Sequence, residues 1–269
     1  MADGFQNKTV MVTGAGSGIG QALAEEFAKR GAQVYATDIT LKQAQVTAKK
    51  IQLAGGTAQA YKCDVTKDAD LKRVMNKIVK EHGQLDVMVN NAGTVYVGEF
   101  VEMTEAQIRK TTDINYNAVQ IGMLYAYRQM KKQGFGQILN IASMGGLLPT
   151  ATMVSYAGTK YGVVGLTVSA AVEAEAYGVD IRAACPGNIQ SNLLVNAATS
   201  TGKPSPILDF LPKAQPANIA AQKIINGLLT KDRLIFTPLY ARIAWYIHRL
   251  LPKLLHKGSK DLIDKYRNI

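Results

Sequence analysis

The chain has 269 residues, a length that one α/β domain can fill, and its 47% hydrophobic and 19% charged residues are typical of a globular protein. It contains no apolar run long enough to span a membrane, and its N-terminal residues are mostly polar, so we expect neither a transmembrane helix nor a signal peptide. Cys63 and Cys185 lie far apart and lack metal-ligand spacing, so we expect reduced thiols and no metal site. The expected compartment is the cytoplasm.

The net charge of +11 is concentrated near the C-terminus. Residues 231–269 hold nine Lys or Arg and three Asp, so an excess of 6 (9 − 3) lies in this segment. The rest of the chain is nearly balanced, and it shows neither a helix-turn-helix pattern nor basic residues interleaved with aromatic ones. We therefore expect no nucleic-acid partner.

A glycine-rich turn follows the first expected strand, residues 10–12. The run from Thr13 to Gly20 reads Thr-Gly-Ala-Gly-Ser-Gly-Ile-Gly and leads into an amphipathic helix with Ile19, Leu23 and Phe27 on one face. Glycines let the backbone come close to a ligand, and the N–H groups at a helix N-terminus attract phosphate. The alternative is an ordinary tight connection, so the turn alone leaves nucleotide binding open.

Asp38 follows the second expected strand, residues 33–37, and lies 18 residues after Gly20. In a dinucleotide-binding βαβ unit, an acid near this spacing accepts hydrogen bonds from the adenosine ribose, and its charge repels a 2′-phosphate. The next residue, Ile39, offers no basic partner for such a phosphate. Asp38 could instead cap the following helix. Taken with the glycine turn, it favours NAD over NADP.

Strands and helices alternate along the rest of the chain. We expect further strands at residues 58–63, 85–90, 137–141, 179–185 and 234–236, and helices at 42–53, 68–82, 105–132 and 218–229. This alternation predicts parallel βαβ units.

Tyr156 and Lys160 are four residues apart, so on a helix they share a face. A cation within about 4–6 Å lowers the pKa of a phenol, which is the tuning that a general acid or base requires. Such a pair is common by chance, but Ser143 follows the strand at 137–141 and so lies at the sheet edge where open α/β sheets bind ligands.

Six motifs in this order resemble those of the short-chain dehydrogenases and reductases over about residues 8–237: the glycine turn, Asp64, the run Asn-Asn-Ala-Gly at 90–93, Asn115, the set Ser143, Tyr156 and Lys160, and Pro186-Gly187. The resemblance implies a Rossmann-type, doubly wound parallel sheet of about seven strands with helices on both faces. It also implies a homo-oligomer, either a dimer or a tetramer.

The resemblance implies that hydride moves between a nicotinamide ring and the carbon of an alcohol or ketone. Tyr156 would exchange the hydroxyl proton and Ser143 would hydrogen-bond the substrate oxygen. Lys160 would hold the nicotinamide ribose and lower the pKa of Tyr156. Asn115 would steady a water that leads from Lys160 to solvent.

The resemblance further implies a set of NAD-binding residues. Asp64 and Val65 would hold the adenine, and Ile189 and Ser191 would orient the nicotinamide carboxamide, with Ser191 standing where the family more often has Thr. The full predicted set is Thr13, Gly14, Ser17, Gly18, Ile19, Gly20, Asp38, Asp64, Val65, Asn91, Ala92, Gly93, Tyr156, Lys160, Pro186, Gly187, Ile189 and Ser191.

Two features bear on the substrate. Asn188 stands where an apolar or aromatic residue is expected, so either the pocket floor is more polar than usual or Asn188 contacts the substrate. A lid is expected at about residues 190–215, where apolar residues alternate with small polar ones and prolines. The apolar residues of the lid are Leu193, Leu194, Ile207, Leu208 and Phe210, and such a segment tends to be mobile and to gate access. A second apolar group surrounds the site in sequence and either forms core or favours a lipophilic substrate; it comprises Met144, Leu147, Leu148, Met153 and Val154.

Residues 239–269 are expected to extend the catalytic unit of residues 1–238 with a basic amphipathic helix that is broken by Pro252. Its apolar stripe comprises Ile243, Ile247, Leu250, Leu251, Leu254 and Leu255, and its basic stripe Arg242, Arg249, Lys253 and Lys257. Three readings stay open: residues 240–258 lie on a membrane surface, they cover the substrate pocket, or they pack against a second subunit.

The leading hypothesis is an NAD-dependent oxidoreductase that interconverts a secondary alcohol and a ketone on a hydrophobic molecule such as a hydroxysteroid or a fatty acyl derivative. The alternative is a nucleotide-sensing or interaction protein on the same fold, which uses the basic C-terminal helix to bind a membrane or a partner.

Overall fold

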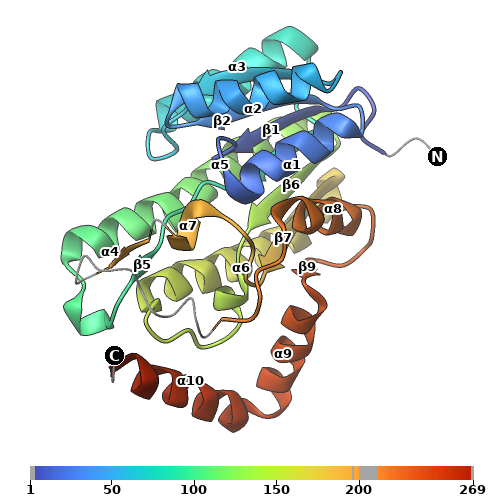
Figure 1. Cartoon of the computed structure of the whole chain (residues 1–269). Helices are drawn as coiled ribbons and strands as arrows, with labels where there is room; N and C mark the ends of the chain where they lie inside the picture. Colours follow the sequence, from blue (N-terminus) through green and yellow to red (C-terminus); the bar gives the residue numbers. More distant parts are fainter. Residues whose placement is uncertain (1–3, 196, 200–210, 268–269) are drawn as a thin grey trace.

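A seven-stranded parallel sheet forms the centre of the molecule in the computed structural model, which describes residues 4–195, 197–199 and 211–267 (Figure 1). The strand order is β3-β2-β1-β4-β6-β7-β9, and every neighbouring pair is parallel. The order reverses between β1 and β4, which is the position where such sheets bind ligands. The strands are β1 (Thr9–Thr13), β2 (Gln33–Asp38), β3 (Thr57–Lys62), β4 (Val87–Asn90), β6 (Gly136–Ile141), β7 (Val179–Pro186) and β9 (Leu234–Thr237).

Helices cover both faces of the sheet (Figure 1), as the sequence predicts. One face carries α1 (Gly18–Lys29), α2 (Leu41–Leu53) and α8 (Ala217–Gly227). The other carries α3 (Asp68–His82), α5 (Ala118–Gln133) and α6 (Val154–Ala174). The predicted doubly wound α/β architecture is confirmed.

The alternation of side chains along each central strand builds two cores. Val10 and Val12 of β1 pack into the cluster under α1 and α8, whereas Met11 packs into the cluster under α3 and α5. In β4, Val89 packs into the first of these clusters and Met88 into the second. Because both faces of these strands are buried, they read as continuous apolar runs in the sequence.

The predicted helix at 105–132 is wrong as a single element. The structure has α4 (Glu105–Thr112), a π-helical turn over Asp113–Asn117 and α5. Within the turn, the Asn115 side chain bonds both backbone polar groups of Thr94. Such local widening of a helix often marks a functional position, and here it places Asn115 beside the proposed site.

The predicted bounds of the other helices and strands differ from the observed ones by a few residues at most; the strand expected at 85–90, for example, begins at Val87. Short elements were not expected: β5 (Tyr96–Val97) pairs with β8 (Ala198–Thr199), α7 spans Asn192–Val195, and single turns occupy Phe100–Glu102, Met144–Gly146 and Glu175–Tyr177. Within the lid expected at 190–215, residues 196 and 200–210 lie outside the described residues, and with them the side chains of Ile207, Leu208 and Phe210.

The C-terminal arm, as we call residues 239–267, consists of α9 (Leu239–Leu250) and α10 (Pro252–Arg267). Pro252 begins the second helix, so the predicted break is observed. The arm leaves the end of β9 and turns back toward the region of α4 (Figure 1). There the Arg267 guanidinium donates two hydrogen bonds, of 2.9 and 2.7 Å, to the carboxylate of Glu99, which precedes α4. Among the described helices, none has the length and apolar character that crossing a membrane requires.

Candidate active site

A cavity of about 770 Å³ opens at the carboxyl ends of the central strands. Its walls come from the glycine turn, the ends of β2, β4, β6 and β7, helix α6 and the first turn of α9. It is lined by every predicted site residue except Thr13 and Asn115, which lie behind its walls. The residues expected to act together are therefore brought together.

The glycine turn leaves no room for side chains at the points where it meets the cavity. Gly14 and Gly18 have positive φ values of 62° and 55°. A Cβ added at Gly20 would lie 2.2 Å from the Gly14 carbonyl oxygen, and one added at Gly14 would lie 2.9 Å from Cα of Ala92. The backbone therefore forms a close-fitting cradle at the N-terminus of α1, which suits a pyrophosphate.

Thr13 and Asn91 tie this cradle to the end of β4. The Thr13 hydroxyl accepts hydrogen bonds from the N–H groups of Asn91 and Ala92, at 2.9 and 3.2 Å, and donates to the Val89 carbonyl. The Asn91 amide donates to the Thr13 carbonyl at 2.8 Å. These residues fix the distance between two walls of the cavity.

Asp38 is held by the backbone at the far end of the cavity from Tyr156. Its carboxylate accepts hydrogen bonds from the N–H groups of Gly16, at 3.1 Å, and Thr40, at 2.9 Å. Among the described residues that line the cavity, only Lys110 and Lys160 are cationic, and neither belongs to β2 or α2 beside Asp38. This end of the cavity therefore offers a carboxylate for ribose hydroxyls and no cation from the neighbouring elements for a 2′-phosphate.

Asp64 and Val65 line the cavity next to this end. Asp64 is oriented locally, because its carboxylate accepts hydrogen bonds from the Thr66 N–H at 3.1 Å and the Thr66 hydroxyl at 2.7 Å. The part of the chain that the structure describes holds no group of three or more His, Cys, Asp or Glu residues that could bind a metal ion.

Ser143 and Tyr156 face each other across the reaction end of the cavity. The Ser143 hydroxyl accepts a hydrogen bond from the Gly145 N–H at 3.0 Å, which leaves its own proton to donate. A Cβ at Gly145 would lie 3.4 Å from the Tyr156 ring, so the glycine lets the loop approach that ring. Burial raises the pKa of Tyr156, and its hydrogen bond with Ser143 opposes this effect.

Lys160 is 4% exposed, and its ammonium donates a hydrogen bond to the Ile141 carbonyl at 2.7 Å. Its nitrogen lies 5.6 Å from the centre of the Tyr156 ring. Burial lowers the pKa of Lys160 to about 8, and the neighbouring Cys185 opposes that shift. Burial is the largest influence on the pKa of Tyr156 and raises it, so the predicted lowering of that pKa by Lys160 is not observed.

Asn115 lies behind the cavity wall with no exposed surface. It accepts a hydrogen bond from the Thr94 N–H and donates to the Thr94 carbonyl, both at 2.8 Å, and it donates to the Thr159 hydroxyl at 3.3 Å. Gly93 lies between Asn115 and Lys160, since a Cβ there would be 3.3 Å from the Asn115 oxygen and 3.9 Å from the Lys160 nitrogen. The observed contacts give Asn115 a role in fixing the wall; a water beside it stays a prediction.

The segment after β7 is held from two sides. The Gly187 N–H donates to the Thr237 carbonyl at 2.8 Å, and the Asn188 N–H donates to the Tyr240 hydroxyl at 2.9 Å. The Asn188 side chain lines the cavity and donates to the Pro212 carbonyl at 2.8 Å, so it anchors the end of the lid segment.

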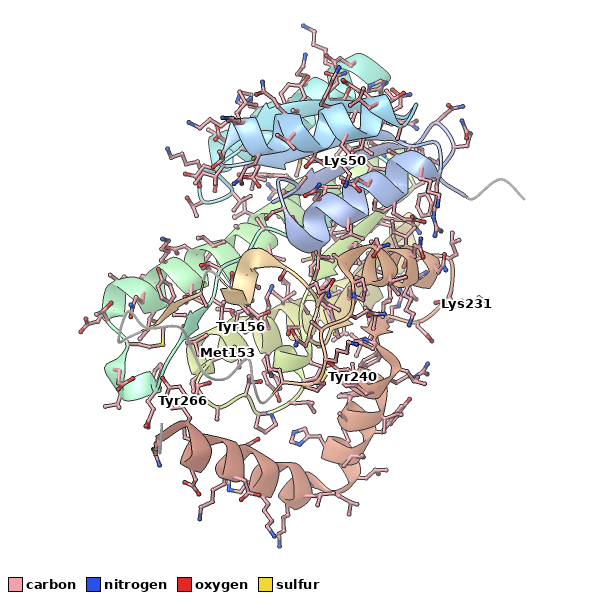
Figure 2. The ribbon with its side chains drawn as sticks, viewed as in Figure 1. Lys50, Met153, Tyr156, Lys231, Tyr240 and Tyr266 are labelled. Atoms are coloured by element: carbon pink, nitrogen blue, oxygen red, sulfur yellow. The ribbon has the colours of Figure 1, made fainter. Side chains whose placement is uncertain are left out.

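Tyr240 is a site residue that the sequence analysis missed. It lines the cavity from the first turn of α9, and Figure 2 shows it where the C-terminal arm begins. Its ring takes the space beside Gly187, where a Cβ would lie 2.5 Å from the phenol oxygen. The only signal in the sequence was its place at the start of the amphipathic helix, which does not indicate contact with Asn188, 52 residues earlier.

The apolar residues predicted around the site divide into two groups. Met144, Leu148 and Met153 line the cavity, together with Leu193 and Leu194 of the lid segment. Leu147 instead belongs to the core, and Val154 is exposed at the surface of α6.

Comparisons with known proteins agree with this geometry. The family model described as short chain dehydrogenase matches residues 8–201. An uncharacterized oxidoreductase of Thermotoga maritima is 40% identical over 79% of this chain and 84% of its own length. A cyclohexanol dehydrogenase of Acinetobacter is 36% identical over 72% of this chain and 78% of its own. Human 17-beta-hydroxysteroid dehydrogenase 13 is 28% identical over 97% of this chain and 83% of its own.

Solved structures resemble the whole architecture. The crystal structure of a short-chain type dehydrogenase/reductase from Mycobacterium marinum has a TM-score of 0.77 and 26% sequence identity, and the match covers 86% of this chain and 94% of that one. The family model alone matches more than half of the residues. The chain therefore belongs to the short-chain dehydrogenase/reductase family of oxidoreductases.

Proposed function

We propose that this protein is an NAD-dependent oxidoreductase that interconverts a secondary alcohol and a ketone on a hydrophobic molecule. The observation that carries the proposal is the grouping of Ser143, Tyr156 and Lys160 at one end of a cavity whose other end presents Asp38. The glycine cradle lines the same cavity, where it can bind the pyrophosphate of a dinucleotide that extends from Asp38 to Tyr156.

The side chains divide the proton chemistry among them. NAD, when bound, supplies the hydride acceptor for the alcohol carbon. Ser143 donates its hydroxyl proton to the substrate oxygen, and Tyr156 in its phenolate form accepts the proton that the alcohol hydroxyl loses. Lys160 lies close enough to favour that phenolate once it forms. In the reverse direction Tyr156 returns the proton to the ketone oxygen.

The preference for NAD rests on Asp38. Its carboxylate lines the cavity and is held in its orientation by hydrogen bonds from two backbone N–H groups. The exposed side chain beside it, Ile39, is apolar. A negative carboxylate repels the phosphate of NADP, whereas it accepts hydrogen bonds from the ribose hydroxyls of NAD.

The hydrophobic substrate class rests on the lining of the reaction end, where Met144, Leu148 and Met153 meet Tyr156. Names of relatives support it, since they include a cyclohexanol dehydrogenase and a 17-beta-hydroxysteroid dehydrogenase. We further propose a homodimer or homotetramer, a catalytic unit of residues 1–238 with a lid near 190–215, and the C-terminal arm as an extension of it.

The competing function is nucleotide sensing or partner binding on the same fold, with the basic arm as the working surface. That function does not require the hydroxyl of Tyr156, which lies beside Ser143 in the cavity. The two functions therefore differ in what the Tyr156→Phe variant does.

The experiment follows reduced-nicotinamide absorbance with NAD or NADP and secondary alcohols graded from propanol-sized to steroid-sized. We expect turnover with NAD that rises with substrate hydrophobicity and is lost in Tyr156→Phe. Tyr161→Phe is the matched control, because Tyr161 is exposed on the same helix and should keep full activity. Tight NADH binding without turnover, or full biological function of Tyr156→Phe, would favour the sensor.

A further inference from the structure

The outer face of the C-terminal arm is apolar and exposed. Leu239, Ile243, Tyr246 and Leu250 of α9 follow one another at intervals of four, three and four residues, so they form one stripe along the helix. Their exposed fractions are 68%, 53%, 47% and 77%. About half or more of the surface of each of these side chains is therefore left uncovered, although the Tyr246 ring also contacts that of Trp245.

The opposite face of α9 accounts for the attachment of the arm to the body. Ala241 is buried, and Ala244 and Trp245 pack against the core cluster under β7. The Trp245 ring lies 5.3 Å from that of Phe236 in β9. The packing of α9 is therefore complete without the outer stripe.

The apolar stripe continues past the bend at Pro252. Leu251 and Leu254 are 60% and 58% exposed. Of the stripe predicted from the sequence, Ile243, Leu250, Leu251 and Leu254 are thus exposed, Ile247 is half-buried, and the Leu255 side chain lies outside the described residues. The apolar surface spans both helices of the arm.

Basic residues surround this surface without acidic neighbours in the sequence. No Asp or Glu occurs between Asp232 and Asp261, whereas six basic residues do: Arg233, Arg242, Arg249, Lys253, Lys257 and Lys260. Arg233 is bound to Glu175 and Asp180, and Arg242 lies 4.0 Å from Asp232. Lys253, Lys257 and Lys260 are exposed and form no ion pair with any described residue.

We propose that the outer face of the C-terminal arm docks on an anionic phospholipid surface. Exposed aliphatic side chains interleaved with unpaired lysines fit the boundary between headgroups and acyl chains, where the leucines enter the apolar layer and the lysines meet the phosphates. A second copy of the chain fits less well, because a symmetric contact would bring two copies of the same basic face together, with like charges on both sides. A nucleic acid also fits less well, because its charged phosphate backbone offers no apolar surface against which the exposed leucines could be buried.

Docking in this way has a consequence that rests on the proposed function. Tyr240 belongs to the first turn of α9, where the arm begins (Figure 2), and it lines the cavity, so the docked arm would hold the cavity close to the bilayer. A hydrophobic alcohol dissolves in the bilayer and reaches a high local concentration there. The membrane is then the source from which the enzyme draws its substrate.

The test measures sedimentation of the full chain with phosphatidylcholine vesicles with and without phosphatidylglycerol. We expect binding to the anionic vesicles that weakens with salt and falls at least about tenfold in Lys253→Glu/Lys257→Glu. The charge-matched control is Lys49→Glu/Lys132→Glu on α2 and α5, where both lysines are exposed. It should bind as the wild type does.

A second pair of variants tests the apolar contribution. Leu250→Ser should weaken binding about fivefold, because one leucine no longer enters the apolar layer. Leu53→Ser is its control, since Leu53 is 76% exposed at the end of α2 and Leu250 is 77% exposed. Equal losses in both variants would count against the arm as the docking face.

Three outcomes overturn the proposal: no binding to anionic vesicles, equal binding by Lys253→Glu/Lys257→Glu and its control, or dissociation of an oligomer by the arm variants in sedimentation velocity. The last would identify the face as a subunit interface. None of these readouts uses turnover, so the docking proposal can fail while the proposed function stands. Turnover of a water-soluble alcohol should be equal in the arm variant and the wild type.

Discussion

The hydroxyl of Tyr240 accepts a hydrogen bond of 2.9 Å from the backbone N–H of Asn188, and so joins the C-terminal arm to the loop after β7. The same loop carries Ile189 and Ser191, which line the cavity. The Asn188 carbonyl accepts a hydrogen bond from the Gln215 N–H at 2.9 Å, so the end of the lid segment is bonded to this loop as well. The position of the loop thus depends on two segments distant in sequence.

Tyr240→Phe should weaken cofactor binding while leaving the fold intact. The variant keeps the ring beside Gly187 but leaves the Asn188 N–H without its acceptor, a loss of about 1 kcal/mol that corresponds to roughly fivefold in affinity. The measurement is the Kd of NADH by fluorescence. Tyr246→Phe, on the exposed face of α9, is the control and should bind NADH like the wild type. Equal affinities in the two variants would show that the loop holds its position without the arm.

Replacing Asp38 with Ser and Ile39 with Arg should move the cofactor preference from NAD to NADP. The double variant removes the charge that repels a 2′-phosphate and adds a cation next to it. We expect the ratio of kcat/KM for NADP over NAD to rise by about two orders of magnitude or more, roughly 3 kcal/mol. Lys42→Arg, a nearby exposed position that does not line the cavity, should not change the ratio. A wild type that already prefers NADP would contradict the interpretation of Asp38.

The sequence was sufficient to predict the central part of the fold, because its strands are buried on both faces and its helices have clear apolar stripes. The resemblance of its motifs to those of a known family also predicted many of the residues that line the cavity, and the strands that precede these motifs end at one edge of the sheet. Gly14 directly follows β1, Asp38 is the last residue of β2, and Ser143 lies two residues after the end of β6.

Contacts over long sequence distances could not be predicted in this way. The π-helical turn at Asn115 arises from bonds to Thr94, 21 residues earlier, and helix periodicity cannot indicate such a partner. Tyr240 reaches Asn188 across 52 residues. The raised pKa of Tyr156 likewise depends on how completely the folded chain excludes water from the phenol.

Asn140→Leu should destabilise the protein, because Asn140 links two elements in the core. It accepts a hydrogen bond from the Asn90 amide at 2.8 Å and donates to the Thr167 hydroxyl at 3.0 Å, and all three residues are buried. The variant leaves the Asn90 amide without an acceptor, at a cost of about 1–3 kcal/mol in the free energy of unfolding. Urea denaturation measures this loss.

The double variant Asn90→Val/Asn140→Leu distinguishes the contribution of the Asn90–Asn140 hydrogen bond to the free energy of unfolding from that of side-chain packing. Because it removes both partners, it should lose less stability than the sum of the two single variants. If the loss of unfolding free energy in the double variant equals the sum of the losses in the two single variants, the hydrogen bond between the two amides does not contribute to stability.

Lys160→Met should abolish turnover. The same variant should nevertheless increase the free energy of unfolding at neutral pH, and this gain in stability should decrease as the pH rises. Burial lowers the pKa of Lys160 from 10.5 to about 8, so the unfolded chain binds its proton more tightly, and the wild type bears a penalty of about 3 kcal/mol at pH 7. Loss of the bond to the Ile141 carbonyl offsets about 1 kcal/mol of the gain in the variant. Above the folded pKa the wild-type lysine becomes neutral, so the penalty decreases as the pH approaches 10.5.

The measurement is the free energy of unfolding of both proteins at pH 7, 8 and 9. The variant should be more stable by about 2 kcal/mol at pH 7, and the difference should narrow by about 1 kcal/mol at pH 9. Lys49→Met provides the control, because Lys49 is exposed on α2 and its substitution should give no pH-dependent difference. If the difference in unfolding free energy between Lys160→Met and the wild type stays constant from pH 7 to 9, Lys160 keeps its ordinary pKa. The ammonium would then be fully charged beside Tyr156 throughout the working range, and its attraction for the phenolate would not fade on the alkaline side.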